Sequence, residues 1–240
     1  MIRKISYWQA FILGVFIFVI SLVIKFFVID GLGQVMQDVR LQQLALQGSF
    51  ILICVIGMLM FKGSKQEFGF RKPDNIHWKI VIFPALLLGA ITSALVIFSP
   101  AKGMSLVKIY GFVNYIIFIW FVSSILEEIF VRGFIQSIIK NNSNGNQSVN
   151  FFKPGNTVLT TALLFGLMHA TLFFKTDGLT AVIIMIMTFL LGIIAGVLRQ
   201  KFNSLLPAIY SHICFNIGGL LGGIIASIIL KTVTGSVPGQ

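Results

Sequence analysis

Two adjacent glutamates, Glu127 and Glu128, lie in a stretch that is otherwise dominated by Ile, Phe, Val and Leu. Glu128 is followed four residues later by Arg132, the order and spacing at which a carboxylate meets a cation on one helix face. Glu127 points about 100° away around the helix, and its neighbours one turn on, Phe130 and Val131, cannot neutralise it. Glu127 is therefore predicted to find its partner on another helix.

Two of the three histidines, His169 and His212, also lie in apolar runs, and Asn216 follows His212 by one helical turn. A carboxylate facing an imidazole can polarise a water molecule into a nucleophile. Two N–H donors aimed at one point can stabilise an oxyanion, and one such donor contributes roughly 3 to 4 kcal/mol in a water-poor site. Glu127, His169, His212 and Asn216 together predict a site that hydrolyses peptide bonds in a peptide or membrane-protein substrate.

The three polar groups are expected at one depth. Glu128, His169 and His212 each lie 12 residues from the nearest polar loop, which is about 18 Å of helix at about 1.5 Å per residue. A charged group in the bilayer core costs roughly 2.5 to 3.5 kcal/mol on insertion scales. Retaining several of them at the same level therefore indicates a function there.

The elements that must position these residues are membrane helices. Of 240 residues, 57% are hydrophobic and 10% are charged, with a mean hydropathy of +0.96, whereas soluble domains carry about 25% charged residues. We predict an all-α polytopic membrane protein with one transmembrane domain over residues 1–240 and seven to eight spans. The apolar runs cover residues 5–29, 44–61, 80–98, 109–139, 157–174, 179–198 and 204–230.

Glycines mark two of these runs. In the last run, Gly218, Gly219, Gly222 and Gly223 leave two alternatives open, a break into two spans or a close crossing of helices. Gly192 and Gly196 form a similar spaced pair, which is typical of helix packing.

The formal net charge of +11 indicates orientation rather than nucleic-acid binding, because the basic residues cluster in short loops. With the N-terminus inside, eleven Lys and Arg fall on the cytoplasmic side and five on the other side. We therefore expect a multi-pass cell-membrane protein with a cytoplasmic N-terminus that contacts the lipid bilayer and binds no nucleic acid. Thirteen Lys against five Arg, together with the Ile and Asn content, indicate a bacterial plasma membrane.

In order and type, the three polar groups resemble the motifs of the CAAX protease and bacteriocin-processing (CPBP) family of intramembrane proteases, also called the Abi family. The resemblance covers about residues 120–218 and includes the string EEIFVRGFIQ. The matching residues are Glu127-Glu128-x-x-x-Arg132, Phe165-x-x-x-His169 and His212-x-x-x-Asn216.

The resemblance implies a bundle of about eight spans, with a polar cavity open to the cytoplasm, protease motifs within about residues 109–230 and N-terminal spans within about residues 5–98. Bacterial members are linked to peptide maturation and bacteriocin self-immunity. By position, the implied roles are Glu127 as the water-activating base, His169 as its helper, His212 and Asn216 as the oxyanion hole, Glu128 and Arg132 as a structural ion pair, and Phe165 as a packing residue.

Other classes of protein remain as alternatives. The same polar groups could bind zinc, although no His-Glu-x-x-His helix is present, and we expect no cofactor and no metal. A buried polar network could also serve a non-enzymatic immunity or scaffold protein, and intramembrane Glu and His occur in proton-coupled transporters. The four aspartates lie at span ends or in loops, which excludes an aspartate protease dyad within the membrane.

Overall fold

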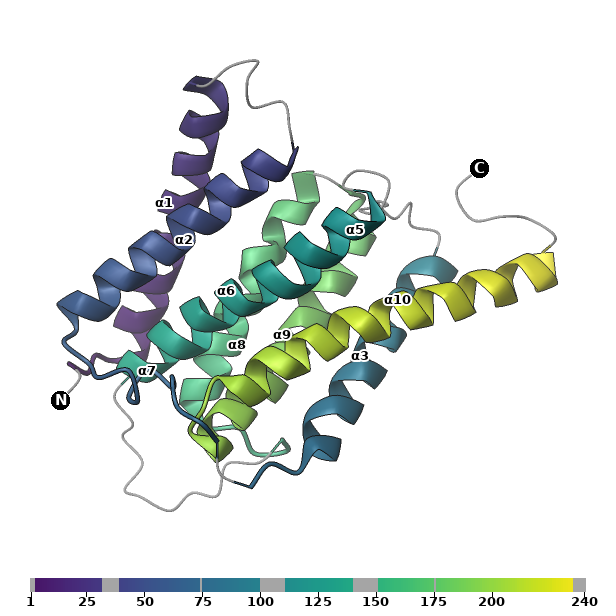
Figure 1. Cartoon of the computed structure of the whole chain (residues 1–240). Coiled ribbons are helices and arrows are strands. Elements are labelled where there is room, and N and C mark those ends of the chain that lie inside the picture. Colours follow the sequence, from purple (N-terminus) through teal and green to yellow (C-terminus); the bar gives the residue numbers. More distant parts are fainter. Residues whose placement is uncertain are drawn as a thin grey trace.

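The computed structural model describes residues 3–31, 39–73, 75–99, 111–139, 151–174 and 176–234. These residues form long helices joined by short connections (Figure 1). The expected polar loop at 141–150 and the basic residues Lys102, Lys108, Lys140 and Lys175 lie outside the described residues. The elements are α1 (Tyr7–Gly31), α2 (Val39–Met60), α3 (Trp78–Phe98), α5 (Phe112–Asn114), η2 (Tyr115–Ser123), α6 (Ser124–Glu128), η3 (Ile129–Ile135), α7 (Gln136–Ile138), α8 (Asn156–Met168), η4 (His169–Phe174), α9 (Gly178–Phe202) and α10 (Leu206–Thr234).

Six stretches in the described part of the chain are long and apolar enough to cross a membrane: Tyr7–Ile24, Trp78–Phe98, Phe112–Ile138, Asn156–Phe174, Gly178–Phe202 and Leu206–Val233. A further helix, α2, has a shorter apolar part, Gln47–Met60. The protein is an all-α polytopic membrane protein, as the hydropathy predicts.

Glycines let α3 and α10 cross closely, which decides between the two alternatives for the last apolar run. A Cβ atom on Gly218 would overlap the backbone of Leu86, and one on Gly222 would overlap the backbone of Ala90. Because both side chains are absent, the backbones pack directly against each other. From Leu206 onward, the run 204–230 therefore lies in one unbroken helix, α10 (Leu206–Thr234), and is not divided into two spans.

The packing of α8 against α9 uses the other glycine pair. A Cβ atom on Gly192 would lie 2.8 Å from the Cα of Ala162, and one on Gly196 would lie 2.9 Å from Val158 Cγ1. The prediction that Gly192 and Gly196 pack helices is confirmed. Close approach of these two helices places the motif residues of α8 beside the α9 backbone.

One end of the bundle gathers the N-terminal segment, residues 61–73 and 75–77, and the turn between α9 and α10. We call it the basic end. The backbone N–H of Arg3 donates to the Phe61 carbonyl at 3.0 Å, and that of Ile5 donates to the Ile138 carbonyl at 2.9 Å. The N–H of Leu205 donates to the Gly69 carbonyl at 3.0 Å. These bonds connect segments that lie far apart in the sequence, and Figure 1 shows the N-terminus at this end.

The first motif lies in a helix that runs continuously through residues 112–138, but this helix is not regular. Two π-helical stretches, η2 and η3, flank the short α-helical segment α6, which contains Glu127 and Glu128. π-Helical turns inside α-helices are rare overall. Where they occur, they are often found at functional sites. α-Helical geometry, which the sequence predicts for the whole span, is therefore confined to its two ends, α5 and α7, and to the segment that contains the two glutamates.

Candidate active site

A buried network of three side chains connects the first and third motifs. Arg132 NH1 donates to Glu128 Oε1 at 3.3 Å, and Arg132 Nε lies 3.3 Å from Glu128 Oε2. His212 Nδ1 lies 3.1 Å from the same Glu128 Oε1. Glu128 and Arg132 are fully buried, and His212 is 6% exposed. The glutamate that the sequence assigns to an ion pair therefore also binds a histidine of α10.

Arg132 also connects its own helix to α8 and α9. Its NH2 group donates to the Gly192 carbonyl at 3.2 Å, and its Cζ atom lies 4.3 Å from the centre of the Phe165 ring. The guanidinium is planar and has five N–H donors, so it can bind a carboxylate, bind a carbonyl and stack on a ring at once. A lysine has no equivalent geometry at this position.

Phe165 lies at the centre of the three motifs. Its ring centre is 5.3 Å from that of His169 and 5.4 Å from that of His212, both in edge-to-face geometry. Phe165 is fully buried, so the positions of both imidazoles depend on it. The three motif segments therefore meet at one level, as counting residues from the polar loops predicts.

The hydrogen bonds determine where the ring hydrogens of the two histidines lie. His169 Nδ1 is 3.0 Å from the Phe165 carbonyl oxygen, which can only accept, so Nδ1 carries the hydrogen and Nε2 has a free lone pair when the ring is neutral. His212 Nδ1 faces a carboxylate oxygen that also accepts from Arg132, so it is a donor too. The two rings share this hydrogen position but differ in their acceptor. The acceptor of His169 is a neutral carbonyl, whereas that of His212 is a carboxylate.

Glu127 is half-buried and points to a different side of the helix from Glu128. Its charge interacts electrostatically with His169 and with Arg132. Within the described residues, no group forms a hydrogen bond with the Glu127 carboxylate. The charge of Glu127 thus acts on an imidazole of another helical segment, while its oxygens remain available to bind a small polar molecule.

Asn216 has a partner that the sequence reasoning missed. Asn216 Nδ2 donates to Ser124 Oγ at 3.0 Å, and Ser124 is fully buried. The amide has two N–H groups, so one remains free. Ser124 precedes Glu128 by four residues and Arg132 by eight, and this spacing along one helix face could have identified it as part of the same network.

A cavity of about 600 Å³ adjoins Asn216. It is lined mainly by apolar residues and glycines of α3 and α10 and extends through Gly219 and Gly223 toward Ile228, away from the basic end. The polar cavity open to the cytoplasm that the resemblance implies stays a prediction. The cavity at Asn216 shows that one face of this residue borders open space between α3 and α10.

The same residues were considered as zinc ligands. In the described ranges, no three His, Cys, Asp or Glu side chains form a group that could hold a metal ion. Glu128 is occupied by Arg132 and His212, and His169 Nδ1 by a backbone carbonyl. Zinc binding by this set would therefore require these side chains to rearrange.

The chain was compared with known proteins. Residues 109–218 match the family model described as type II CAAX prenyl endopeptidase Rce1-like, and this range contains all seven residues of the three motifs. The match confirms the resemblance based on those motifs. No curated protein and no solved structure matches the chain.

Proposed function

Because residues 109–218 match the Rce1-like type II CAAX prenyl endopeptidase family model, we propose that the chain is an intramembrane endopeptidase of this kind, which hydrolyses a peptide bond by means of a water activated by Glu127. The substrate class is a peptide or a membrane protein. The observation that carries the proposal is the meeting of the three motifs around Phe165. The charge of Glu127 acts on His169, which supports the pairing of these two groups.

In the first step, a water molecule binds between the Glu127 carboxylate and His169 Nε2. The neutral ring accepts one hydrogen of the water at Nε2, since Nδ1 donates to the Phe165 carbonyl. Glu127 takes the other proton as the water oxygen attacks the substrate carbonyl carbon. The attack yields a tetrahedral intermediate with a negative oxygen.

In the second step, His212 and Asn216 stabilise that oxygen. Asn216 has one amide N–H in addition to the one that binds Ser124. When both ring nitrogens of His212 carry a hydrogen, Nδ1–H donates to Glu128. Nε2–H is then available to donate to the negative oxygen. Glu127 then transfers its proton to the leaving nitrogen as the C–N bond breaks, which regenerates the carboxylate.

Glu128 and Arg132 have a positioning role in this scheme. Together they hold His212 and attach the first-motif helix to the α9 backbone at Gly192. We further propose that the basic end faces the cytoplasm, in line with the excess of Lys and Arg there. Roles in peptide maturation or bacteriocin self-immunity in a bacterial plasma membrane are proposals that follow from the family resemblance alone.

The test compares membranes from cells that express the wild type, Glu127→Gln or Glu67→Gln at matched levels. Glu67→Gln makes the same chemical change at the basic end, where Gln can also cap the Ser64 turn. Protein N-termini are then identified by mass spectrometry. We expect new termini with the wild type and Glu67→Gln, and none with Glu127→Gln.

Three results would contradict the proposal. The same termini with Glu127→Gln would show that this carboxylate is not the base. If no wild-type-dependent terminus appears and Glu127→Gln still supports the cellular phenotype, a non-enzymatic immunity or scaffold role becomes the better explanation. Proton flux in proteoliposomes would instead favour a transporter.

A further inference from the structure

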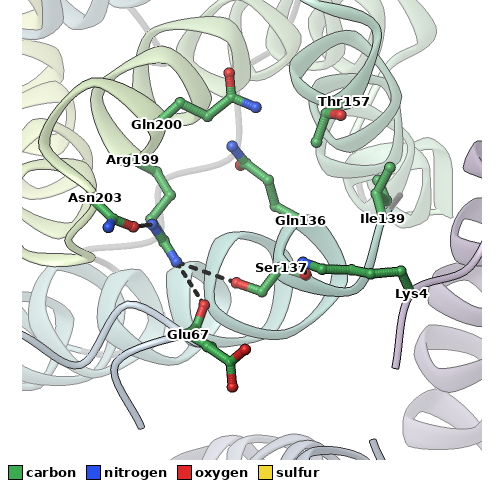
Figure 2. A pocket seen from close by; sticks show the side chains of 9 residues that line it. All are labelled: Lys4, Glu67, Gln136, Ser137, Ile139, Thr157, Arg199, Gln200 and Asn203. Carbon is green, nitrogen blue, oxygen red and sulfur yellow. Dashed lines mark hydrogen bonds between the residues drawn. The ribbon is translucent and has the colours of Figure 1, made fainter. Parts of the chain in front are cut away.

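A second pocket, of about 400 Å³, lies at the basic end and contains none of the residues of the three motifs. Figure 2 shows its lining, which comes from the N-terminal segment, the residues before α3, α7, the first turn of α8 and the end of α9. These are all helix ends or connections at one end of the bundle. In a membrane protein, this is the level of the lipid headgroups.

The pocket contains a buried cation without a counter-ion. Arg199 is 6% exposed, and its guanidinium donates to the Glu67 carbonyl at 3.1 Å, to Ser137 Oγ at 3.2 Å and to Asn203 Oδ1 at 3.2 Å (Figure 2). All three acceptors are neutral. In the part of the chain that the structure describes, no carboxylate lies within ion-pair distance of Arg199. A buried charge that lacks an opposite charge is costly.

A second cation, Lys4, lines the same pocket. Its ammonium donates to the Ser137 carbonyl. Burial lowers the pKa of Lys4, Glu67 partly opposes this effect, and the charge of Arg199 lowers the pKa further. The two cations therefore repel each other across the pocket, and an anion between them would relieve the repulsion.

Glu67, whose carboxylate lines the pocket, offsets only part of this positive charge. Its Oε2 accepts from the Ser64 backbone N–H at 2.8 Å, and its negative charge acts on Lys4. In the part of the chain that the structure describes, it forms no ion pair with Arg199. Arg71, on the neighbouring segment, adds another positive charge that acts on Arg199. The groups that face Arg199 thus have an excess of positive charge.

The remaining lining groups suit an oxygen-rich ligand. Thr157 belongs to the first turn of α8, whose helix dipole favours negative charge. Gln136 and Gln200 provide amides that can bind phosphate oxygens or hydroxyl groups. The volume also fits a headgroup, because ligand pockets span roughly 300 to 1,000 Å³.

From these observations we propose that the pocket at the basic end binds a phosphate ester, with Lys4 and Arg199 neutralising the phosphate. The ligand is either the headgroup of an anionic phospholipid or a soluble phosphate ester. When bound, it connects the N-terminal segment, α7, α8 and α9. The proposal does not depend on proteolysis, since no motif residue takes part.

The test measures binding of phosphatidylglycerol, phosphatidylcholine and glycerol 3-phosphate to the purified full-length protein by native mass spectrometry, and their effect on the unfolding temperature. The variants are Lys4→Gln, which leaves Arg199 and its bonds in place, and Gln200→Glu, which adds a negative charge to the lining. Lys65→Gln is the control, because Lys65 is an exposed cation at the same end but does not line the pocket.

We expect wild type and Lys65→Gln to retain phosphatidylglycerol in preference to phosphatidylcholine. Lys4→Gln should weaken retention about fivefold, the effect of losing one cation near a phosphate, and Gln200→Glu should also weaken it. If glycerol 3-phosphate binds with the same dependence on Lys4, the ligand is a soluble phosphate ester and the site stands. Equal retention of the two lipids, or equal weakening by Lys4→Gln and Lys65→Gln, would overturn the proposal.

Discussion

His212 Nδ1 lies 3.1 Å from Glu128 Oε1, a contact between residues 84 positions apart in the sequence. The contact distinguishes the two adjacent glutamates. Glu128 is buried and bound to Arg132 and His212, whereas Glu127 is half-buried and its charge acts on His169. The carboxylate of Glu127 can bind a water molecule, as a general base must. That of Glu128 is already bound to two side chains, which suits a residue that positions others.

The two glutamates should therefore respond differently to loss of charge. Glu127→Gln should lower turnover of the identified substrate about 10²- to 10⁴-fold, the usual contribution of a general base, and leave the unfolding temperature unchanged. Glu128→Gln should lower the unfolding temperature, because the buried Arg132 loses its counter-charge. Turnover and thermal unfolding of both variants in one detergent check this, and a stable Glu128→Gln beside an unstable Glu127→Gln would reverse the assignment.

The ion pair itself can be tested by a double-mutant cycle. Arg132→Met leaves the Glu128 carboxylate buried without its cation and should cost about 3 to 5 kcal/mol of stability. Adding Glu128→Gln removes the uncompensated charge, so the double variant should be more stable than Arg132→Met alone. Chemical denaturation of the four proteins gives the coupling energy, and purely additive effects would contradict the pairing.

Asn216 and Ser124 should affect the same step to different extents. Asn216→Ala removes the proposed oxyanion donor and should lower kcat about 10²- to 10³-fold with KM nearly unchanged. Ser124→Ala keeps the amide but removes the hydroxyl that orients it, so the loss should be smaller. Ser211→Ala is the control, since this buried hydroxyl binds only the Ala208 carbonyl of its own helix. A loss of kcat in the control equal to that of Ser124→Ala would indicate a general packing effect.

Gly192 should tolerate no side chain. An added Cβ would lie 2.8 Å from the Cα of Ala162 and 3.2 Å from Arg132 NH2, so Gly192→Ala should destabilise the protein by about 1 to 3 kcal/mol and lower activity by displacing Arg132. Gly48→Ala, where a Cβ meets nothing within 4 Å, should leave stability unchanged or raise it. Thermal unfolding of both variants tests this prediction. If Gly192→Ala and Gly48→Ala change the unfolding temperature equally, the close contact at Gly192 does not matter for stability.

Metal removal should leave activity unchanged under the proposed mechanism. Incubation with EDTA or 1,10-phenanthroline, followed by dialysis, should preserve substrate cleavage, because the nucleophilic water is activated by Glu127. Metal analysis of the purified protein accompanies the assay. Loss of cleavage that zinc restores would instead support the zinc alternative.

Much of this protein follows from local properties of the sequence. Hydropathy predicts the helices, because any segment that crosses a bilayer must satisfy its backbone hydrogen bonds internally. The spacing of Glu128 and Arg132 predicts their ion pair, since residues four apart share one helix face. The three motifs also predict a resemblance to the CAAX proteases, which the family-model match over residues 109–218 confirms.

The remaining features depend on how separate helices pack, which no local pattern encodes. The contact of His212 with Glu128, the bond between Asn216 and Ser124 and the direction of the cavity at Asn216 all involve groups on different helices. Each depends on the distance and rotation of α10 relative to α3 and α6. Glycines at the α3–α10 crossing allow these two helices to approach closely. The sequence shows that such glycines are present, but only the assembled helices show which helix each glycine contacts.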